Sequence, residues 1–149
     1  MVCKFLSDVI LNSIPFSGFF LSDFTPVESI YLCLCTYIVL AFNGFLKYLF
    51  QNLSSQHNFT LPLLGTMCRP SNLSCNLETS SMDMGMPSGH AQTVAFVATY
   101  LYLKNKSKFG IYLVIIIMYC RVYLQKHTIS QVIIGTMIGI ACGYYFYLM

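Results

Sequence analysis

Apolar residues along the chain gather into long runs separated by short polar links. Four runs stand out, over residues 30–50, 86–103, 109–124 and 129–149. A helix needs about 20 apolar residues to cross a hydrocarbon core about 30 Å thick. The first and fourth runs are long enough. The second and third are shorter, so we expect their ends to lie near the headgroups. The pattern predicts an all-α protein, a multi-pass transmembrane helix bundle with four firm spans.

A weaker apolar run covers residues 9–24, where Asn12, Pro15 and Gly18 interrupt it. It predicts either a kinked span or a segment lying at the membrane surface. Residues 1–11 lack the charge pattern and cleavage site of a signal peptide, so we expect them to belong to the fold. Residues 1–149 are therefore predicted to form a single membrane-embedded domain, with N-terminal apolar segments over 1–50, a polar loop over 51–85 and a helical core over 86–149.

Composition strengthens the membrane interpretation. Hydrophobic residues make up 56% of the chain, charged residues only 9%, and a soluble domain carries about a quarter charged residues. The net charge of +3 does not indicate a nucleic-acid partner, because three of the eight basic residues lie in one short link (Lys104, Lys106 and Lys108, the lysine loop) and no basic face appears. We expect lipid to cover much of the surface.

The lysine loop predicts the orientation, since short basic links stay on the cytoplasmic side. Alternation then places residues 51–85 and 121–128 together on the lumenal or external face, and Met149 in the cytoplasm. Three glycosylation sequons agree with this placement: Asn52-Leu-Ser, Asn58-Phe-Thr and Asn72-Leu-Ser. Asn105-Lys-Ser falls on the cytoplasmic side and should stay unmodified.

The seven cysteines form no Cys-x-x-Cys pair and no zinc-type spacing. Four lie in apolar runs and are expected to be small buried hydrophobes: Cys33, Cys35, Cys120 and Cys142. Cys68 and Cys75 lie in the polar loop, where they could form a disulfide if that loop is lumenal.

Three polar groups converge on the predicted outer face: Arg69-Pro70, Gly85-Met-Pro-Ser-Gly-His90 and Arg121-Val-Tyr-Leu-Gln-Lys-His127. A phosphoryl group in transfer spreads negative charge over its oxygens, so its catalysis is largely positioning and charge stabilisation. Arginine offers a planar fork that matches phosphate oxygens. Ser88 and Gly89 open a helix, whose free N–H groups favour an anion, and Gly89 has no Cβ to keep a ligand away.

Two histidines complete the chemistry of phosphoryl transfer. His127 can attack phosphorus and His90 can protonate the leaving group, since imidazole titrates near neutrality. The five acidic residues form no cluster, so we expect neither a metal nor another cofactor.

Each group also has a plainer interpretation. Arg69 could be an exposed loop residue before a turn, and Ser88 could simply cap the helix. His127 could be a neutral histidine at the membrane interface. Arg121 is harder to explain in this way, because it ends an apolar run, where ionisable groups are costly and usually functional.

At these residues the sequence resembles the type 2 phosphatidic acid phosphatase superfamily. That pattern has three parts: Lys, six residues, Arg-Pro; then Pro-Ser-Gly-His; then Ser-Arg, five residues, His, three residues, Asp. The match covers roughly residues 69 to 135. It implies a nucleophile in His127, a general acid and then base in His90, and four phosphate-binding residues: Arg69, Ser88, Gly89 and Arg121.

The chain departs from the pattern at three positions. Pro62 stands at the lysine, Cys120 at the serine and Gln131 at the aspartate. The Gln131 amide oxygen can accept the ring N–H of His127 one helical turn away, without the charge of a carboxylate. Gln131 also fits a capping box with Thr128, and the two roles are compatible.

The stretches around Gly85 and from Arg121 to Gly135 look like the dolichyldiphosphatase branch, which also carries Gln at this position. This resemblance implies a polyprenyl diphosphate substrate, with phosphatidic acid second, in an endoplasmic-reticulum-like membrane with a lumenal site. The three departures leave an alternative open: a catalytically weakened membrane protein that binds lipid phosphate without turnover. The oligomeric state is not predicted.

Overall fold

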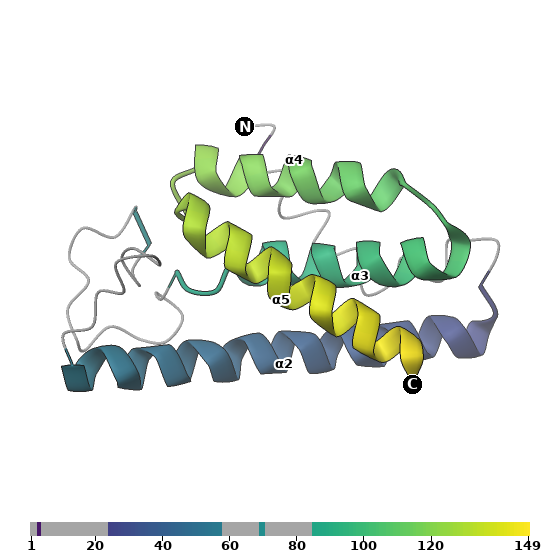
Figure 1. Cartoon of the computed structure of the whole chain (residues 1–149), viewed down its shortest axis with the longest axis horizontal. Helices are drawn as coiled ribbons and strands as arrows, with labels where there is room; N and C mark the ends of the chain where they lie inside the picture. The colour runs from purple at the N-terminus through teal and green to yellow at the C-terminus, as the bar shows by residue number, and fades with distance from the viewer. Residues whose placement is uncertain (1–2, 4–23, 58–68, 71–84) are drawn as a thin grey trace.

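The computed structural model describes residues 3, 24–57, 69–70 and 85–149. They form a helical bundle whose elements are α2 (Pro26–His57), α3 (Gly89–Asn105), α4 (Phe109–Tyr123) and α5 (Ile129–Leu148) (Figure 1). All four predicted apolar runs are confirmed as helices. The weak run over 9–23, the sequons at Asn58 and Asn72, and the pair Cys68 and Cys75 lie outside the described residues.

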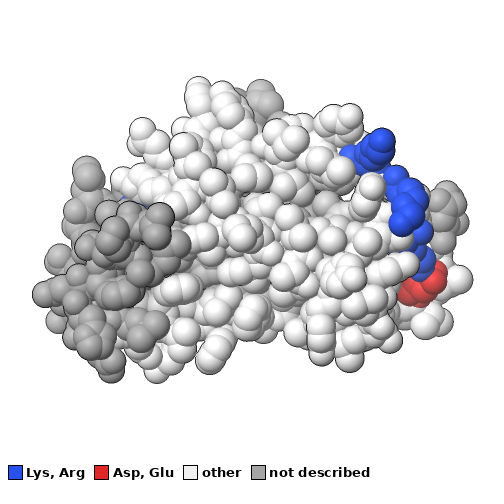
Figure 2. Space-filling view, viewed as in Figure 1, with Lys and Arg blue, Asp and Glu red and all other residues white. Residues whose placement is uncertain are grey.

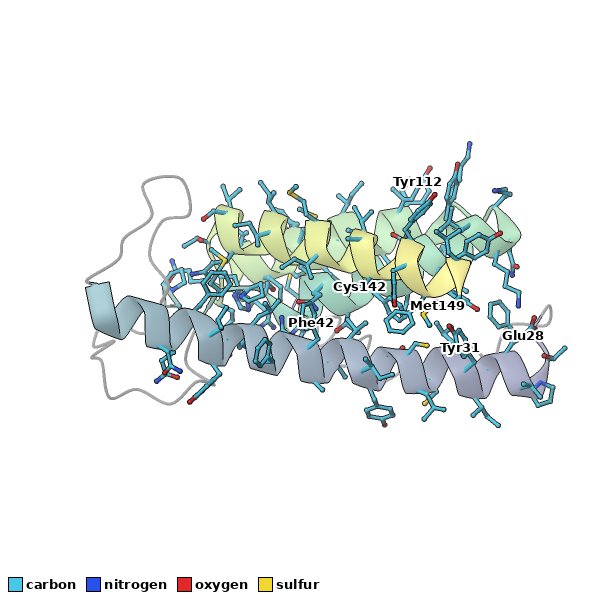
Figure 3. All side chains as sticks on the ribbon, turned by 60° about the horizontal axis from the view of Figure 1, so that its bottom comes forward. Glu28, Tyr31, Phe42, Tyr112, Cys142 and Met149 are labelled. Carbon is cyan, nitrogen blue, oxygen red and sulfur yellow. The ribbon has the colours of Figure 1, made fainter. Side chains whose placement is uncertain are left out.

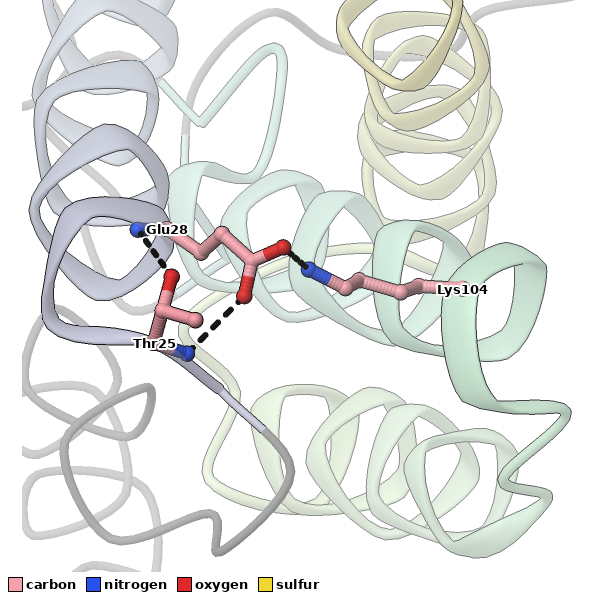
Figure 4. A network of polar contacts seen from close by, with 3 residues as sticks. All are labelled: Thr25, Glu28 and Lys104. Atoms are coloured by element: carbon pink, nitrogen blue, oxygen red, sulfur yellow. Dashed lines mark hydrogen bonds and ion pairs between the residues drawn. The ribbon is translucent and has the colours of Figure 1, made fainter.

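Helix α2 begins at a capping box. Thr25 Oγ1 accepts the backbone N–H of Glu28 at 3.3 Å, and Glu28 Oε2 accepts the N–H of Thr25 at 2.9 Å. Glu28 also pairs with Lys104, which ties the start of α2 to the end of α3 (Figure 4).

At its other end α2 continues to His57. Residues 51–57, which were predicted to begin the polar loop, are therefore helical, and Asn52 of the first sequon lies in this helix. The physical reason is that no Gly or Pro between Gly44 and Pro62 interrupts it.

Helices α3 and α5 pack with their backbones in contact. Gly135, Gly139 and Gly143 recur every fourth residue along one face of α5. A Cβ at Gly135 would lie 2.5 Å from the Ser88 carbonyl oxygen, and one at Gly143 would lie 2.7 Å from the Phe96 carbonyl oxygen. Small residues at such spacing let two membrane helices approach closely. This contact fixes the first turn of α3 against the first turn of α5.

The outer surface of the bundle is apolar. Large side chains of α2, α4 and α5 point outward, among them Phe45, Ile115 and Tyr145 at 57–59% exposure. Two helical stretches are long and apolar enough to cross a membrane, Pro26–Asn52 and Ile129–Leu148, while Phe109–Tyr123 is apolar but shorter. These features are those of a membrane protein; the count of four spans stays a prediction.

The bundle has two distinct ends. The lysine loop and Glu28 gather at one end, and the face between the ends is largely uncharged (Figure 2). The C-terminus lies toward this lysine end, where the Tyr31 hydroxyl of α2 donates to the Phe146 carbonyl of α5 at 3.0 Å (Figure 3). The opposite end carries the start of α3 and the α4–α5 link (Figure 1). We call this the site end.

Candidate active site

The turn before α3 presents Ser88 at the helix N-cap, with φ −69° and ψ 109°. Its backbone N–H donates to the Gln131 carbonyl at 3.1 Å, so α5 holds the turn in place. The Ser88 hydroxyl does not cap the helix: its Oγ is fully buried and makes no hydrogen bond with any described residue. A buried hydroxyl without a partner is costly, so Ser88 has hydrogen-bonding capacity that a phosphate oxygen or a water molecule could take up.

A tight turn places His127. The backbone N–H groups of Lys126 and His127 both donate to the Arg121 carbonyl, at 3.1 and 3.3 Å, and Gln125 takes a left-handed conformation with φ 52°. The five-residue spacing between Arg121 and His127 is therefore a structural requirement of this turn. Both side chains are buried, with 7% and 2% of their surface exposed.

Hydrogen bonding fixes the tautomer of His127. Its Nδ1 lies 2.9 Å from the Gly85 carbonyl oxygen, which can only accept, so Nδ1 carries the proton. The lone pair then sits on Nε2, which lies 3.4 Å from Nη2 of Arg121. His127 thus presents an unprotonated nitrogen beside a guanidinium group.

Burial lowers the pKa of His127 to about 3. The nearby charges of Arg121, Arg69 and Lys47 act in the same direction, and the hydrogen bond to Gly85 opposes them. His127 is accordingly neutral near pH 7, the state that a nucleophile requires.

Positive charge surrounds both histidines. The side chains of Arg121, Lys47 and Arg69 all act electrostatically on the His90 imidazole, as they do on His127. Arg69 is half-buried, and its Nε is buried without a hydrogen bond to any described residue. Residues predicted from three distant parts of the sequence thus lie close enough at the site end to act on one another electrostatically.

Residues 28–149 match a family model described as the PAP2 superfamily. The chain belongs to this superfamily. It is 35% identical over 85 residues to dolichyldiphosphatase 1 of Dictyostelium discoideum, an alignment covering 47% of this chain and 37% of that protein. It is 32% identical over 80 residues to lipid phosphate phosphatase gamma of Arabidopsis thaliana, covering 44% of this chain and 35% of that protein. The chain therefore spans little more than a third of either relative, and no solved structure matches it significantly.

Gln131, at the aspartate position of the PAP2 pattern, forms the predicted capping box. Its Oε1 accepts the Thr128 N–H at 3.1 Å, and Thr128 Oγ1 accepts the Gln131 N–H at 3.3 Å. The hydrogen bond predicted from His127 to Gln131 is corrected here: the acceptor at Nδ1 is the Gly85 carbonyl, because the amide folds back onto the helix start. A Cβ on Gly85 would overlap the Gln131 amide, so the Gln131 side chain packs directly against the residue whose carbonyl accepts the His127 N–H.

Two further residues of the site end were missed at the sequence level. Asn43 of α2 donates to the Gln92 amide oxygen at 2.7 Å and to the Pro87 carbonyl at 3.4 Å. Lys47 of α2, near the end of the first apolar run, was not counted among the candidate site residues, yet its charge acts on both histidines. The available signal was the presence of polar residues inside apolar runs, where they are expensive and often functional.

Proposed function

We propose that this PAP2 protein is a metal-independent lipid phosphatase that works through a phosphohistidine on His127. The observation that carries the proposal is the state of that side chain: buried and neutral, with Nδ1–H on the Gly85 carbonyl and Nε2 beside Arg121. An imidazole held in this way has a defined nucleophilic atom and a positive charge ready for the phosphate it attacks.

In the first step the phosphate binds between Arg69 and Arg121, with the Ser88 hydroxyl and the free N–H groups at the start of α3. His127 Nε2 attacks the terminal phosphorus, so a P–N bond forms while the P–O bond to the leaving group breaks; the leaving group is the lipid monophosphate of a diphosphate substrate or the lipid alcohol of a monophosphate. His90 gives its proton to the leaving oxygen.

In the second step a water molecule attacks the phosphohistidine and His90 accepts its proton. The P–N bond breaks, releasing inorganic phosphate and neutral His127. The cycle needs no metal, because guanidinium groups supply the charge stabilisation that a metal ion provides in other phosphatases.

The substrate class follows from the relatives and the surface. The names of the two relatives refer to dolichyl diphosphate and to lipid phosphate. Together with the apolar surface of the bundle, they support a polyprenyl diphosphate such as dolichyl diphosphate as first candidate and phosphatidic acid as second. We place the protein in an endoplasmic-reticulum-like membrane, with the site end lumenal and the C-terminus cytoplasmic.

A second candidate is a protein that binds lipid phosphate without turning it over. Gln131 motivates it: where the PAP2 pattern has an acid, this chain has an uncharged amide, and the His127 ring donates to an uncharged carbonyl. A carboxylate would stabilise the positive imidazole ring of the phosphohistidine more strongly.

Phosphate release distinguishes the two candidates. The full chain, purified in detergent with a chelator present, is incubated with a polyprenyl diphosphate and with phosphatidic acid. The phosphatase proposal predicts release by the wild type and by Lys108→Met, a control at the lysine end, and none by His127→Ala. Binding of phosphate without release by the wild type would favour the second candidate.

A further inference from the structure

Helix α2 forms one wall of the site end, through its buried Asn43. Besides its bonds to Pro87 and Gln92, Asn43 lies against Gly89, where a Cβ would come within 3.0 Å of its Oδ1. The Gln92 amide in turn donates to the Val39 carbonyl at 3.3 Å. The face of α2 that bears Asn43 therefore packs directly on the turn that precedes His90.

Lys47 lies one helical turn beyond Asn43 on this same face, in the direction of the site end. Its side chain is half-buried. Its charge interacts with Arg69 and Arg121 as well as with both histidines. If the Lys47 ammonium group only extended to the lipid headgroups, repulsion would turn it away from the guanidinium groups of Arg69 and Arg121.

Lys47, Arg69 and Arg121 thus form a cluster of three cations that acts on both histidines. A phosphate carries negative charge on several oxygens, and cationic side chains that converge on these oxygens are a common way to bind it. The arrangement therefore fits a phosphate-bearing ligand.

We propose that Lys47 of α2 is a phosphate-binding residue of this active site, in the role that the superfamily pattern gives to a lysine and that Pro62 cannot fill. The proposal rests on the phosphatase function above and deepens it. Because α2 packs on the turn bearing His90, while His127 comes from the α4–α5 link, Lys47 lies on the leaving-group side. With a diphosphate substrate it contacts the phosphate that stays on the lipid.

Phosphate binding tests the proposal without any need for turnover. The thermal unfolding of the detergent-purified full chain is followed during titration with inorganic phosphate, for the wild type, Lys47→Met, Lys47→Arg and Lys108→Met. We expect Lys47→Met to weaken phosphate binding about ten- to a hundredfold, as loss of one charge-assisted hydrogen bond does. Lys47→Arg should keep most of the affinity and Lys108→Met all of it.

The same titration separates a binding role from a structural one. Without phosphate, Lys47→Met should be at least as heat-stable as the wild type, because removing one of three like charges relieves repulsion. A Lys47→Met protein that is less stable or unfolded without phosphate, or that binds phosphate as well as the wild type, would overturn the proposal.

Turnover then tests the placement of Lys47. Lys47→Met should lower kcat/KM for a polyprenyl diphosphate at least tenfold more than for phosphatidic acid. Equal losses on both substrates would contradict the leaving-group placement. If the wild type hydrolyses neither lipid, the proposed function fails, while the phosphate titration still decides whether Lys47 binds the anion.

Discussion

The Nδ1 atom of His127 and the carbonyl oxygen of Gly85 lie 2.9 Å apart, although 42 residues separate them in the chain. This bond joins the α4–α5 link to the segment that opens α3. It sets the tautomer of His127 and so, in the proposed mechanism, decides which ring nitrogen attacks phosphorus. In the proposed mechanism this neutral carbonyl orients the His127 ring, as the resemblance implies for the aspartate of the PAP2 pattern, but without a charge.

Gly85→Ala tests that relationship. The new Cβ would overlap the Gln131 amide and displace the Gly85 carbonyl. We expect kcat for phosphate release to fall at least tenfold with little change in KM, since the effect falls on the nucleophile and not on phosphate binding. Gly44→Ala is the matched control, because a Cβ at Gly44 meets no atom within 4 Å. Wild-type kcat in Gly85→Ala would mean that the carbonyl does not orient the ring.

Gly135→Ala tests the contact between α5 and the start of α3. The Cβ would lie 2.5 Å from the Ser88 carbonyl oxygen, so the two backbones must separate. We expect the free energy of unfolding to fall by about 1–3 kcal/mol, as for other overpacked contacts. Activity should fall as well, because Ser88 moves relative to His127. Thermal unfolding in detergent and phosphate release measure the two effects, with Gly44→Ala again as control; an unchanged melting temperature would show that the helices can separate freely.

Much of the fold could be predicted, because an apolar run of sufficient length in so hydrophobic a chain has few alternatives to a helix. The four runs became α2 to α5. The end of α2 could not be predicted from hydropathy, since its last turns are polar and continue only because nothing breaks them.

The site was predictable to the extent that single residue types imply chemistry. His127, His90, Arg69 and Arg121 were predicted from their residue types and from the topology that brings them to one end of the bundle, and their roles in catalysis stay predictions. The acceptor at His127 Nδ1 was not, because a backbone carbonyl leaves no trace in a sequence. Lys47 was missed for a different reason: in a sequence, a lysine near the end of a span fits a headgroup contact and an inward-facing cation equally well. The structure adds that Asn43, one helical turn before Lys47 on the same face, packs on Pro87 and Gly89.

The stability of the protein should depend on pH through His127. Its pKa is about 3 in the folded state and about 6.5 in an unfolded chain, so the unfolded state binds more protons between these values. The contribution of a neutral His127 is therefore fully present above about pH 6.5 and is lost as the pH falls toward 3. At pH 5 the loss is about 2 kcal/mol. Thermal unfolding between pH 7.5 and 5 should show a smaller pH dependence in His127→Gln; equal slopes would argue against a buried, neutral ring.

Arg121→Lys tests whether the shape of the guanidinium group matters beyond its charge. Arg121 is buried, with Nη2 beside Nε2 of His127, and lysine offers a point charge without a planar fork. We expect kcat/KM to fall about tenfold or more, with vanadate inhibition weakened in parallel. Lys108→Met, at the opposite end of the bundle, removes a whole positive charge far from the site and should leave both quantities unchanged. If Arg121→Lys behaved like that control, the charge at position 121 would suffice and the planar fork would play no part in holding the phosphate.

The central claim is tested most directly by trapping the covalent intermediate. The purified full chain is mixed with a polyprenyl diphosphate carrying radiolabelled terminal phosphate, quenched in base within the first turnovers, and analysed for protein-bound label. The mechanism predicts a base-stable, acid-labile phosphohistidine at His127 in the wild type and in Lys108→Met, and none in His127→Ala. Phosphate release by the wild type with no trapped label, or release that persists in His127→Ala, would contradict it.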